Sequence, residues 1–393
     1  MSDSAISTRR GLALGLLTFL LMLPETLPVP VLRAAVLERF AVTDAQASWF
    51  MSANMLGAIV AAPLIAWLGD RTRSRRGLCI AAIALDAILV QLLAHPLSFA
   101  EFLGLRVLEG MAHISALSLL MAQCSDAAGE RRGRVMGMVG AGLTLGVALG
   151  AALGGKIGRI DPLLTLHTGS GVLAAATLLA LACLPADTGT SLQPRANLRT
   201  ALQQSGAWLP LAFAFVDRFT VGFFTSGFPL CMAGVHGLSG PDIGILLACF
   251  LLPFALLSYP FGRLAERIPS VWLVAVGSGA YGVLVMLVGG IATNWLWYLM
   301  PALGLASAVM FVPTLLLLLE RCPNMGRSAA MAAFHGAGSL GFLLGPLCCG
   351  AIVAWTGELS RGYTLAFAFA GLTELLCVFL LVPAIRRLRS SAQ

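Results

Sequence analysis

Apolar segments of about 20 residues recur along the whole chain, and a chain of this kind can fold in few ways. A membrane-spanning helix needs about 20 mostly apolar residues, because the hydrocarbon core of a bilayer is about 30 Å thick. The composition agrees, since 58% of the residues are hydrophobic, 11% are charged and the mean hydropathy is +0.89, whereas soluble domains contain about 25% charged residues. We therefore predict an all-α membrane protein with twelve transmembrane helices, at residues 11–32, 48–68, 78–94, 99–124, 136–155, 163–184, 207–232, 243–262, 271–290, 295–319, 329–354 and 363–383.

The placement of arginine indicates the orientation of these helices. Cytoplasmic loops of membrane proteins carry an excess of Arg and Lys. If both termini are cytoplasmic, eighteen of the 25 basic residues fall in inside loops and five in outside loops. This bias predicts a multi-pass protein of the bacterial inner membrane, embedded in the lipid bilayer, with both termini in the cytoplasm. The basic residues are spread over short loops, so we expect no nucleic-acid binding.

The two halves of the chain repeat each other. Ala66–Ser74 reads AWLGDRTRS and Gly262–Ser270 reads GRLAERIPS, an offset of 196 residues. Parallel repeats of six helices are typical of one large transporter architecture. We expect an N-terminal six-helix bundle at residues 1–184, a cytoplasmic linker at 185–206 and a C-terminal six-helix bundle at 207–393.

A charged loop motif occurs once in each half. Between the second and third predicted helices it contains Asp70, Arg71 and Arg75, and the matching positions of the second half hold Glu266 and Arg267. One interpretation of this arginine-rich loop is that it serves only to fix the topology of the membrane helices.

Two further motifs lie inside predicted helices. The fourth helix contains Arg106-x-x-x-Gly110, and a charge deep in a membrane costs several kcal/mol unless it is paired or hydrated. Small residues four apart let helices approach closely. Such a glycine motif comprises Gly146, Gly150, Gly154 and Gly155 in the fifth helix and Gly341, Gly345 and Pro346 in the eleventh, at an offset of 195.

With these motifs the chain resembles the major facilitator superfamily over essentially its whole length, and within it the twelve-helix drug/proton antiporter-like exporters. It departs from the family pattern at Ala66, where the loop motif has its first glycine, and at Ala151, where the helix-5 motif has proline. The resemblance implies two pseudo-symmetric six-helix bundles that work by alternating access, usually as a monomer. It implies a conformational-switch role for the charged loops, a role in substrate and proton coupling for Arg106, and export for the glycine motif.

Other charged residues within the apolar segments are candidates for the same coupling site. Glu25 lies among three prolines that must disturb the first helix, and broken membrane helices mark binding sites. We expect Glu25 to carry a proton and to pair with Arg106, although a purely structural ion pair is the alternative. Arg106, Glu109 and His113 share one face of the fourth helix, because spacings of three and four stack on a helix. Asp86 is another candidate partner of Arg106.

Asp217 and Arg218 lie together in the seventh predicted helix. Because adjacent helical residues point about 100° apart, we expect each to find a partner on another helix and not to pair with its neighbour. The string DRFTVG that contains them is loosely similar to the Asp-Arg motif of spinster-type lipid transporters and organic-anion symporters. Asp217 is therefore a second candidate coupling residue, and Glu374 in the last helix faces either a neighbouring helix or the periphery.

No enzyme chemistry is indicated. The chain lacks a phosphate-binding loop and a nucleophile elbow, and its nine cysteines lack the spacing of a metal site, so we expect no cofactor and no metal. The sequence favours secondary active transport, with proton-coupled efflux of a small organic or amphipathic compound as the first hypothesis. The alternatives are a proton-coupled symporter for an organic anion or metabolite, and a lipid flippase or non-transporting membrane receptor.

Overall fold

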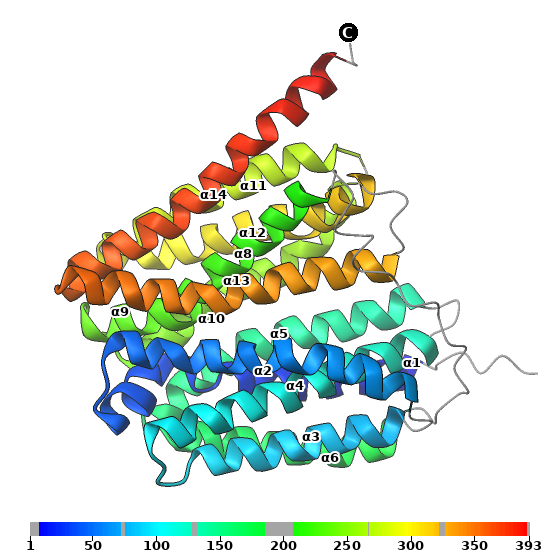
Figure 1. The fold of residues 1–393 in the computed structure, drawn as a ribbon, viewed down its shortest axis with the longest axis vertical. Helices are drawn as coiled ribbons and strands as arrows, with labels where there is room; N and C mark the ends of the chain where they lie inside the picture. The colour runs from blue at the N-terminus through cyan, green and yellow to red at the C-terminus, as the bar shows by residue number, and fades with distance from the viewer. Residues whose placement is uncertain are drawn as a thin grey trace, which may run out of the picture. The chain divides into compact units, whose positions relative to one another are not determined.

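A computed structural model of the protein describes residues 8–71, 75–127, 132–184, 207–265, 267–321 and 327–390. In these ranges all regular secondary structure is helical (Figure 1). The first half contains α1 (Thr8–Thr26), α2 (Asp44–Arg71), α3 (Arg75–Leu93), α4 (Phe99–Ala127), α5 (Arg132–Gly158) and α6 (Leu164–Cys183). The second half contains α8 (Trp208–Gly222), α9 (Phe228–Gly234), α10 (Gly240–Leu264), α11 (Ser270–Val288), α12 (Thr293–Arg321), α13 (Arg327–Thr356) and α14 (Leu359–Ser390).

The helices coincide with the twelve predicted segments, so the all-α membrane fold is confirmed. Within the described residues, eleven helical stretches are long and apolar enough to cross a membrane. The other long helix, α2, has 28 residues. The predicted linker at 185–206 lies outside the described residues, and the domain boundary placed there remains a prediction.

The first helix of each half is interrupted near its middle. α1 ends at Thr26, and a 3₁₀ turn at Val29–Val31 and a π-helical segment at Arg33–Glu38 continue the chain. The disturbance expected from the prolines is therefore present. In the second half the predicted helix at 207–232 is present as one helical stretch from Trp208 to Gly234, and a π-helical turn at Phe223–Gly227 lies between its α-helical parts α8 and α9. Pro229, at the start of α9, has no backbone N–H to donate, so the helical hydrogen-bond pattern is displaced there.

The helices form two compact units, each with its own interior. Unit 1 comprises Met1–Val42, Ala53–Gln193 and Ser239–Ala248, and unit 2 comprises Thr43–Ser52, Pro194–Leu238 and Cys249–Gln393. The beginnings of α2 and α10 thus belong to a different unit from the remainder of each helix.

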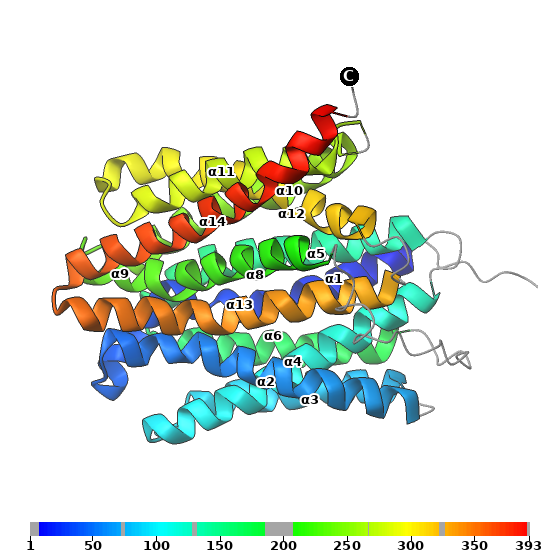
Figure 2. The same cartoon turned by 45° about the horizontal axis from the view of Figure 1, so that its top comes forward.

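Glycine faces bring pairs of helices into backbone contact within each unit. α1 lies along α5, and α8 lies along α13 (Figure 2). A Cβ atom at Gly146 would lie 2.6 Å from the carbonyl oxygen of Phe19, one at Gly150 would overlap the carbonyl oxygen of Leu23 on α1, and one at Gly154 would overlap that of Leu27, just after the end of α1. In unit 2, a Cβ at Gly341 or Gly345 would overlap a backbone carbonyl of α8 in the same way. The close approach predicted from the glycine motif is therefore present in both units.

Candidate functional site

Five titratable side chains converge in the interior of unit 1. We call them the charge cluster; its members are Glu25 on α1, Asp86 on α3, and Arg106, Glu109 and His113 on α4. Asp86 has no exposed surface, and the side chains of Arg106 and Glu109 are 3% and 2% exposed. Such a concentration of charge inside a membrane helix bundle is rare and marks functional sites.

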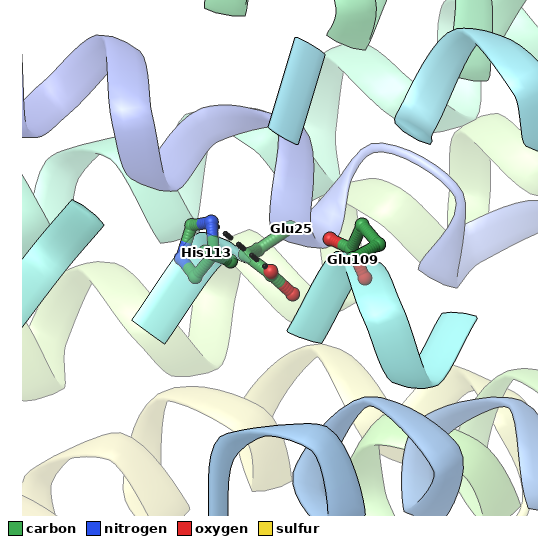
Figure 3. A group of neighbouring side chains, drawn as sticks. All are labelled: Glu25, Glu109 and His113. Atoms are coloured by element: carbon green, nitrogen blue, oxygen red, sulfur yellow. Dashed lines mark ion pairs between the residues drawn. The ribbon is translucent and has the colours of Figure 1, made fainter. Parts of the chain in front are cut away.

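The contacts in the charge cluster fall into a short set and a long set. Arg106 Nη1 donates to Glu109 Oε2 at 2.5 Å, and His113 Nδ1 lies 2.9 Å from Asp86 Oδ2. By contrast, Glu25 Oε2 lies 3.4 Å from Arg106 Nη2, and Glu25 Oε1 lies 3.4 Å from His113 Nδ1. Figure 3 shows Glu25, Glu109 and His113 pointing toward one another, with the ion pair between Glu25 and His113 dashed. Glu25 is therefore the loosely held member of the group.

The helix spacing places the cationic and acidic groups of α4 side by side. Arg106, Glu109 and His113 are separated by three and four residues and so occupy one helix face. Gly110 lies on the adjoining part of α4, where a Cβ atom would overlap the backbone carbonyl of Asn54 on α2. Because the two backbones meet there, Asn54 Nδ2 reaches Glu109 Oε2 at 2.9 Å.

The interruption of α1 and its contact with α5 fix the position of Glu25. Glu25 lies one residue before the end of α1, and Pro24 lies within the same turn. Thr26 Oγ1 donates to the carbonyl oxygen of Val147 on α5 at 2.7 Å. The contact of α1 with the glycine face of α5 thus fixes the position of the turn that contains Glu25.

The charge cluster contains more acids than cations. Three carboxyl groups face one guanidinium, which remains charged throughout the physiological pH range. With every carboxyl ionised and His113 neutral, the group would carry two uncompensated negative charges, and burying unpaired charge costs several kcal/mol. Two protons would neutralise it, and the buried Oδ1 of Asp86 and Nε2 of His113 have no hydrogen-bond partner among the described residues. Burial therefore favours a charge cluster in which some of these titratable groups carry a proton.

A metal ion fits the charge cluster less well than a proton does. Ligand atoms of Glu25, Glu109 and His113 lie within 4.8 Å of one another, and two carboxylates with one imidazole can bind a transition metal. However, Arg106 already donates to both carboxylates. A divalent cation would have to displace that guanidinium from the same oxygens.

In unit 2, the contacts of the Asp217 and Arg218 side chains differ from the prediction. Arg218 Nε lies 3.9 Å from Asp217 Oδ2, so these neighbours do interact, and the expectation that they would not pair is wrong. The long arginine side chain can turn back along the helix, although 3.9 Å is at the limit of an ion pair. The Arg218 guanidinium also lies over the ring of Phe311 on α12, 4.9 Å from its centroid.

A second buried acid lies near Asp217. Glu374 on α14 is 0% exposed, which excludes the peripheral position that the sequence left open. Its charged neighbour in the described part of unit 2 is Asp217 on α8, and Tyr281 on α11 is also fully buried beside both acids. Asp217 therefore has Arg218 beside it at 3.9 Å, whereas the charged group beside Glu374 in the described part of unit 2 is another acid.

The comparison with protein families decides the class of this protein. The profile described as Major Facilitator Superfamily matches residues 14–216 and again residues 210–392. Together the two matches cover nearly the whole chain and follow its repeat. The chain belongs to the major facilitator superfamily. A comparison with curated protein sequences gives no match.

Solved structures of major facilitators share this fold at low sequence identity. The nucleoside transporter NupG matches with a TM-score of 0.77 at 15% identity, covering 96% of this chain and 99% of that one. A bacterial homolog of the human lysosomal transporter Spinster, in an inward-facing and unoccupied conformation, matches with a TM-score of 0.73 at 16% identity, covering 96% and 95%. The human organic anion transporter MFSD10 (TETRAN) matches with a TM-score of 0.63 at 20% identity, covering 95% and 97%. The membership supports a multi-pass membrane transporter that is not an enzyme.

The charged loops of this major facilitator lie mostly at the edge of what the structure describes. α2 ends at Arg71 and α3 begins at Arg75, but the side chains of Asp70 and Arg71 lie outside the described part. Glu266 lies outside it as well, and Arg267 is exposed. The conformational-switch role of these residues remains a prediction.

One member of the site escaped the sequence reasoning. Asn54 is 2% exposed and contacts both Glu109, at 2.9 Å, and Glu25, at 3.5 Å. The search for charged residues passed over it because its amide is neutral. A search for any amide within an apolar segment would have found it, since polar groups in membrane helices need partners. Asp86, considered as a partner of Arg106, is instead hydrogen-bonded to His113.

Proposed function

We propose that this major facilitator is a proton-coupled exporter of small organic compounds in the bacterial inner membrane. It acts as a monomer by alternating access, with both termini in the cytoplasm. The observation that carries the proposal is the charge cluster, in which three carboxyl groups share one permanent cation. Coupling then needs no cofactor, because protons and substrate compete for the same buried charges.

Glu25 is the proton carrier in this proposal. Its contacts with Arg106 and His113 are the longest in the charge cluster, and its side chain keeps 13% exposure. Glu109 is held at 2.5 Å by Arg106 and at 2.9 Å by Asn54. A group held by long contacts can change partners at small cost, so Glu25 releases and rebinds a proton while Glu109 keeps Arg106 in place.

The charge of the site favours cationic or neutral substrates. Arg106 is already engaged by two carboxylates, so little positive charge remains for an anion in unit 1. The glycine motif of α5 supports the direction of export by its resemblance to exporters.

Uptake of an organic anion is the second candidate. The similarity in fold to the organic anion transporter MFSD10 and the partly exposed guanidinium of Arg218 favour it. In that case Arg218 binds the anion and a proton accompanies the substrate inward. Movement of lipid between leaflets, or ligand binding without flux, is the remaining alternative.

A vesicle assay separates these functions. Inside-out vesicles are energised to an acid interior, a pH-sensitive dye reports the interior, and a panel of organic cations, neutral compounds and organic anions is added. We expect protons to leave the vesicles when a cationic or neutral compound is added to the wild-type protein. Glu25→Gln abolishes this response, while Glu358→Gln, the same change at an exposed residue, leaves it intact.

Each of the other possible outcomes of these assays indicates a different mechanism or function. A response that persists in both Glu25→Gln and Arg106→Ala removes the charge cluster from the mechanism. Alkalinisation of the medium when an organic anion is added to intact cells indicates uptake. Transfer of a labelled lipid without any proton movement indicates a flippase, and binding without flux indicates a receptor.

A further inference from the structure

Glu374 is a fully buried acid whose charge nothing nearby balances. It lies in the middle of α14 at 0% exposure, and neither carboxyl oxygen has a hydrogen-bond partner among the described residues. α14 packs against α11 in backbone contact, since a Cβ at Gly371 would overlap the carbonyl oxygen of Gly282. The two helices lie side by side (Figure 1).

The hydroxyl groups of Thr220 and Ser278 also face Glu374. Thr220 Oγ1 on α8 donates to the carbonyl oxygen of Asp217 at 2.8 Å, and Ser278 Oγ on α11 donates to Met310 Sδ at 3.2 Å. The Tyr281 hydroxyl on α11 is buried near the hydroxyls of Thr220 and Ser307. The site thus contains several polar oxygens with unused hydrogen-bonding capacity.

The titratable groups around Glu374 come from three helices. Asp217 faces it from α8, Tyr281 from α11, and Cys377 follows on α14 itself. Arg218 is directed to Asp217 and to the ring of Phe311. An ionised carboxylate buried without a cation costs several kcal/mol, and a second acid nearby increases that cost. A carboxylic acid that keeps its proton avoids it.

We propose that Glu374 is a second proton-binding site, located in unit 2 and distinct from the charge cluster of unit 1. In this proposal Glu374 carries its proton in the conformation described above. Asp217, whose side chain keeps 14% exposure, is the route by which the proton leaves. For release, the two side chains must first come within hydrogen-bonding distance; the Glu374 carboxylic acid then gives its proton to the Asp217 carboxylate, which leaves Glu374 ionised and Asp217 neutral, and Asp217 gives the proton to water.

Infrared spectroscopy of the full-length protein in lipid bilayers tests this directly. The carbonyl stretch of a protonated carboxylic acid is separate from the bands of ionised carboxylates. We expect wild type to show such a band and Glu374→Gln to lose one component of it, while the component from the charge cluster remains. Glu358→Gln, an exposed control on the neighbouring loop, keeps both components. The band is read without substrate, so its result is independent of the transport assay.

Two further measurements complete the test. Raising the pH should convert the Glu374 band reversibly into a carboxylate band while the protein remains folded. Transfer into D₂O should shift the band more slowly in Asp217→Asn than in wild type. Glu374→Met, a neutral side chain of similar length, serves if Glu374→Gln does not fold.

The proposal is overturned by any of three results. The first is that the glutamine and methionine variants lose a carboxylate band instead of a carboxylic acid band. The second is an acid band that stays unchanged until the protein unfolds, which would make Glu374 a permanent neutral packing group. The third is exchange in Asp217→Asn at the wild-type rate, which would remove Asp217 as the route.

Discussion

The two units use the same helix scaffold to bury acidic groups in opposite ways. In unit 1, Glu25, Asp86 and Glu109 surround a guanidinium and an imidazole, and short contacts hold most of the group. In unit 2, Asp217 and Glu374 lie near each other, and the cation beside Asp217 is 3.9 Å away and 32% exposed. The first group depends on electrostatic balance, whereas the second depends on a retained proton.

The scaffold itself differs little between the units. Each begins with a helix in which the regular α-helical hydrogen bonding ends near the middle, at Thr26 and at Gly222. In each unit this helix packs against a glycine face of another helix. The positions of the charges do not follow the repeat, since Arg106 has no charged counterpart near Ala302. The duplicated architecture therefore specifies the helix packing, and a few side chains specify the chemistry of each unit.

Removal of Arg106 from unit 1 should lower stability and transport more than removal of Arg218 from unit 2. Arg106→Ala leaves Glu25 and Glu109 buried without their cation, and breaking a buried pair in this way costs about 3–5 kcal/mol. We expect a fall in thermal unfolding temperature and loss of proton-coupled transport, with partial recovery of stability in Arg106→Lys. Unfolding in detergent and the vesicle assay measure these effects. Normal stability and transport in Arg106→Ala would show that unit 1 does not depend on charge balance.

The backbone contact at Gly110 should give a medium effect. Gly110→Ala inserts a methyl group against the carbonyl of Asn54, and overpacking of this kind costs about 1–3 kcal/mol. Gly104 is the matched control on α4, because a Cβ there has nothing within 4 Å. Gly104→Ala should leave stability unchanged or raise it by about 0.5–1 kcal/mol. Equal unfolding temperatures for the two variants would contradict the close approach of α2 and α4.

Removing Arg218 should have the smallest effect. Its ion pair with Asp217 is long and partly exposed, and pairs of this kind contribute about 0–1 kcal/mol. The contact with Phe311 adds about 0.5–1 kcal/mol at most at a partly exposed site. Arg218→Met keeps the apolar part of the side chain and should change the unfolding temperature little. A loss as large as that of Arg106→Ala would mean that unit 2 is also balanced by a cation.

Much of the fold followed from the sequence because hydrophobicity and proline act locally. The twelve apolar segments coincide with the helices, and the prolines around Glu25 account for the end of α1. The convergence of Glu25 with the face of α4 was also expected, since unpaired charges must meet inside a membrane. What remained out of reach depended on side-chain conformation and on neutral groups. Arg218 turns back to its neighbour, and Asn54 contributes through an amide that a search for charges does not detect.

The glycine contacts also have a mechanical consequence for the charge cluster. α1 and α5 interlock through the glycines of α5, and α2 and α4 interlock at Gly110, so we expect each helix pair to move as a rigid body. Glu25 belongs to the first helix pair and Arg106 to the second. The three contacts that join the two pairs through Glu25 measure 3.4–3.5 Å. If the pair α1 and α5 slid along the pair α2 and α4 by about 1.5 Å, the rise of one helical residue, Glu25 would separate from Arg106 and His113. The glycine contacts within each pair would stay intact.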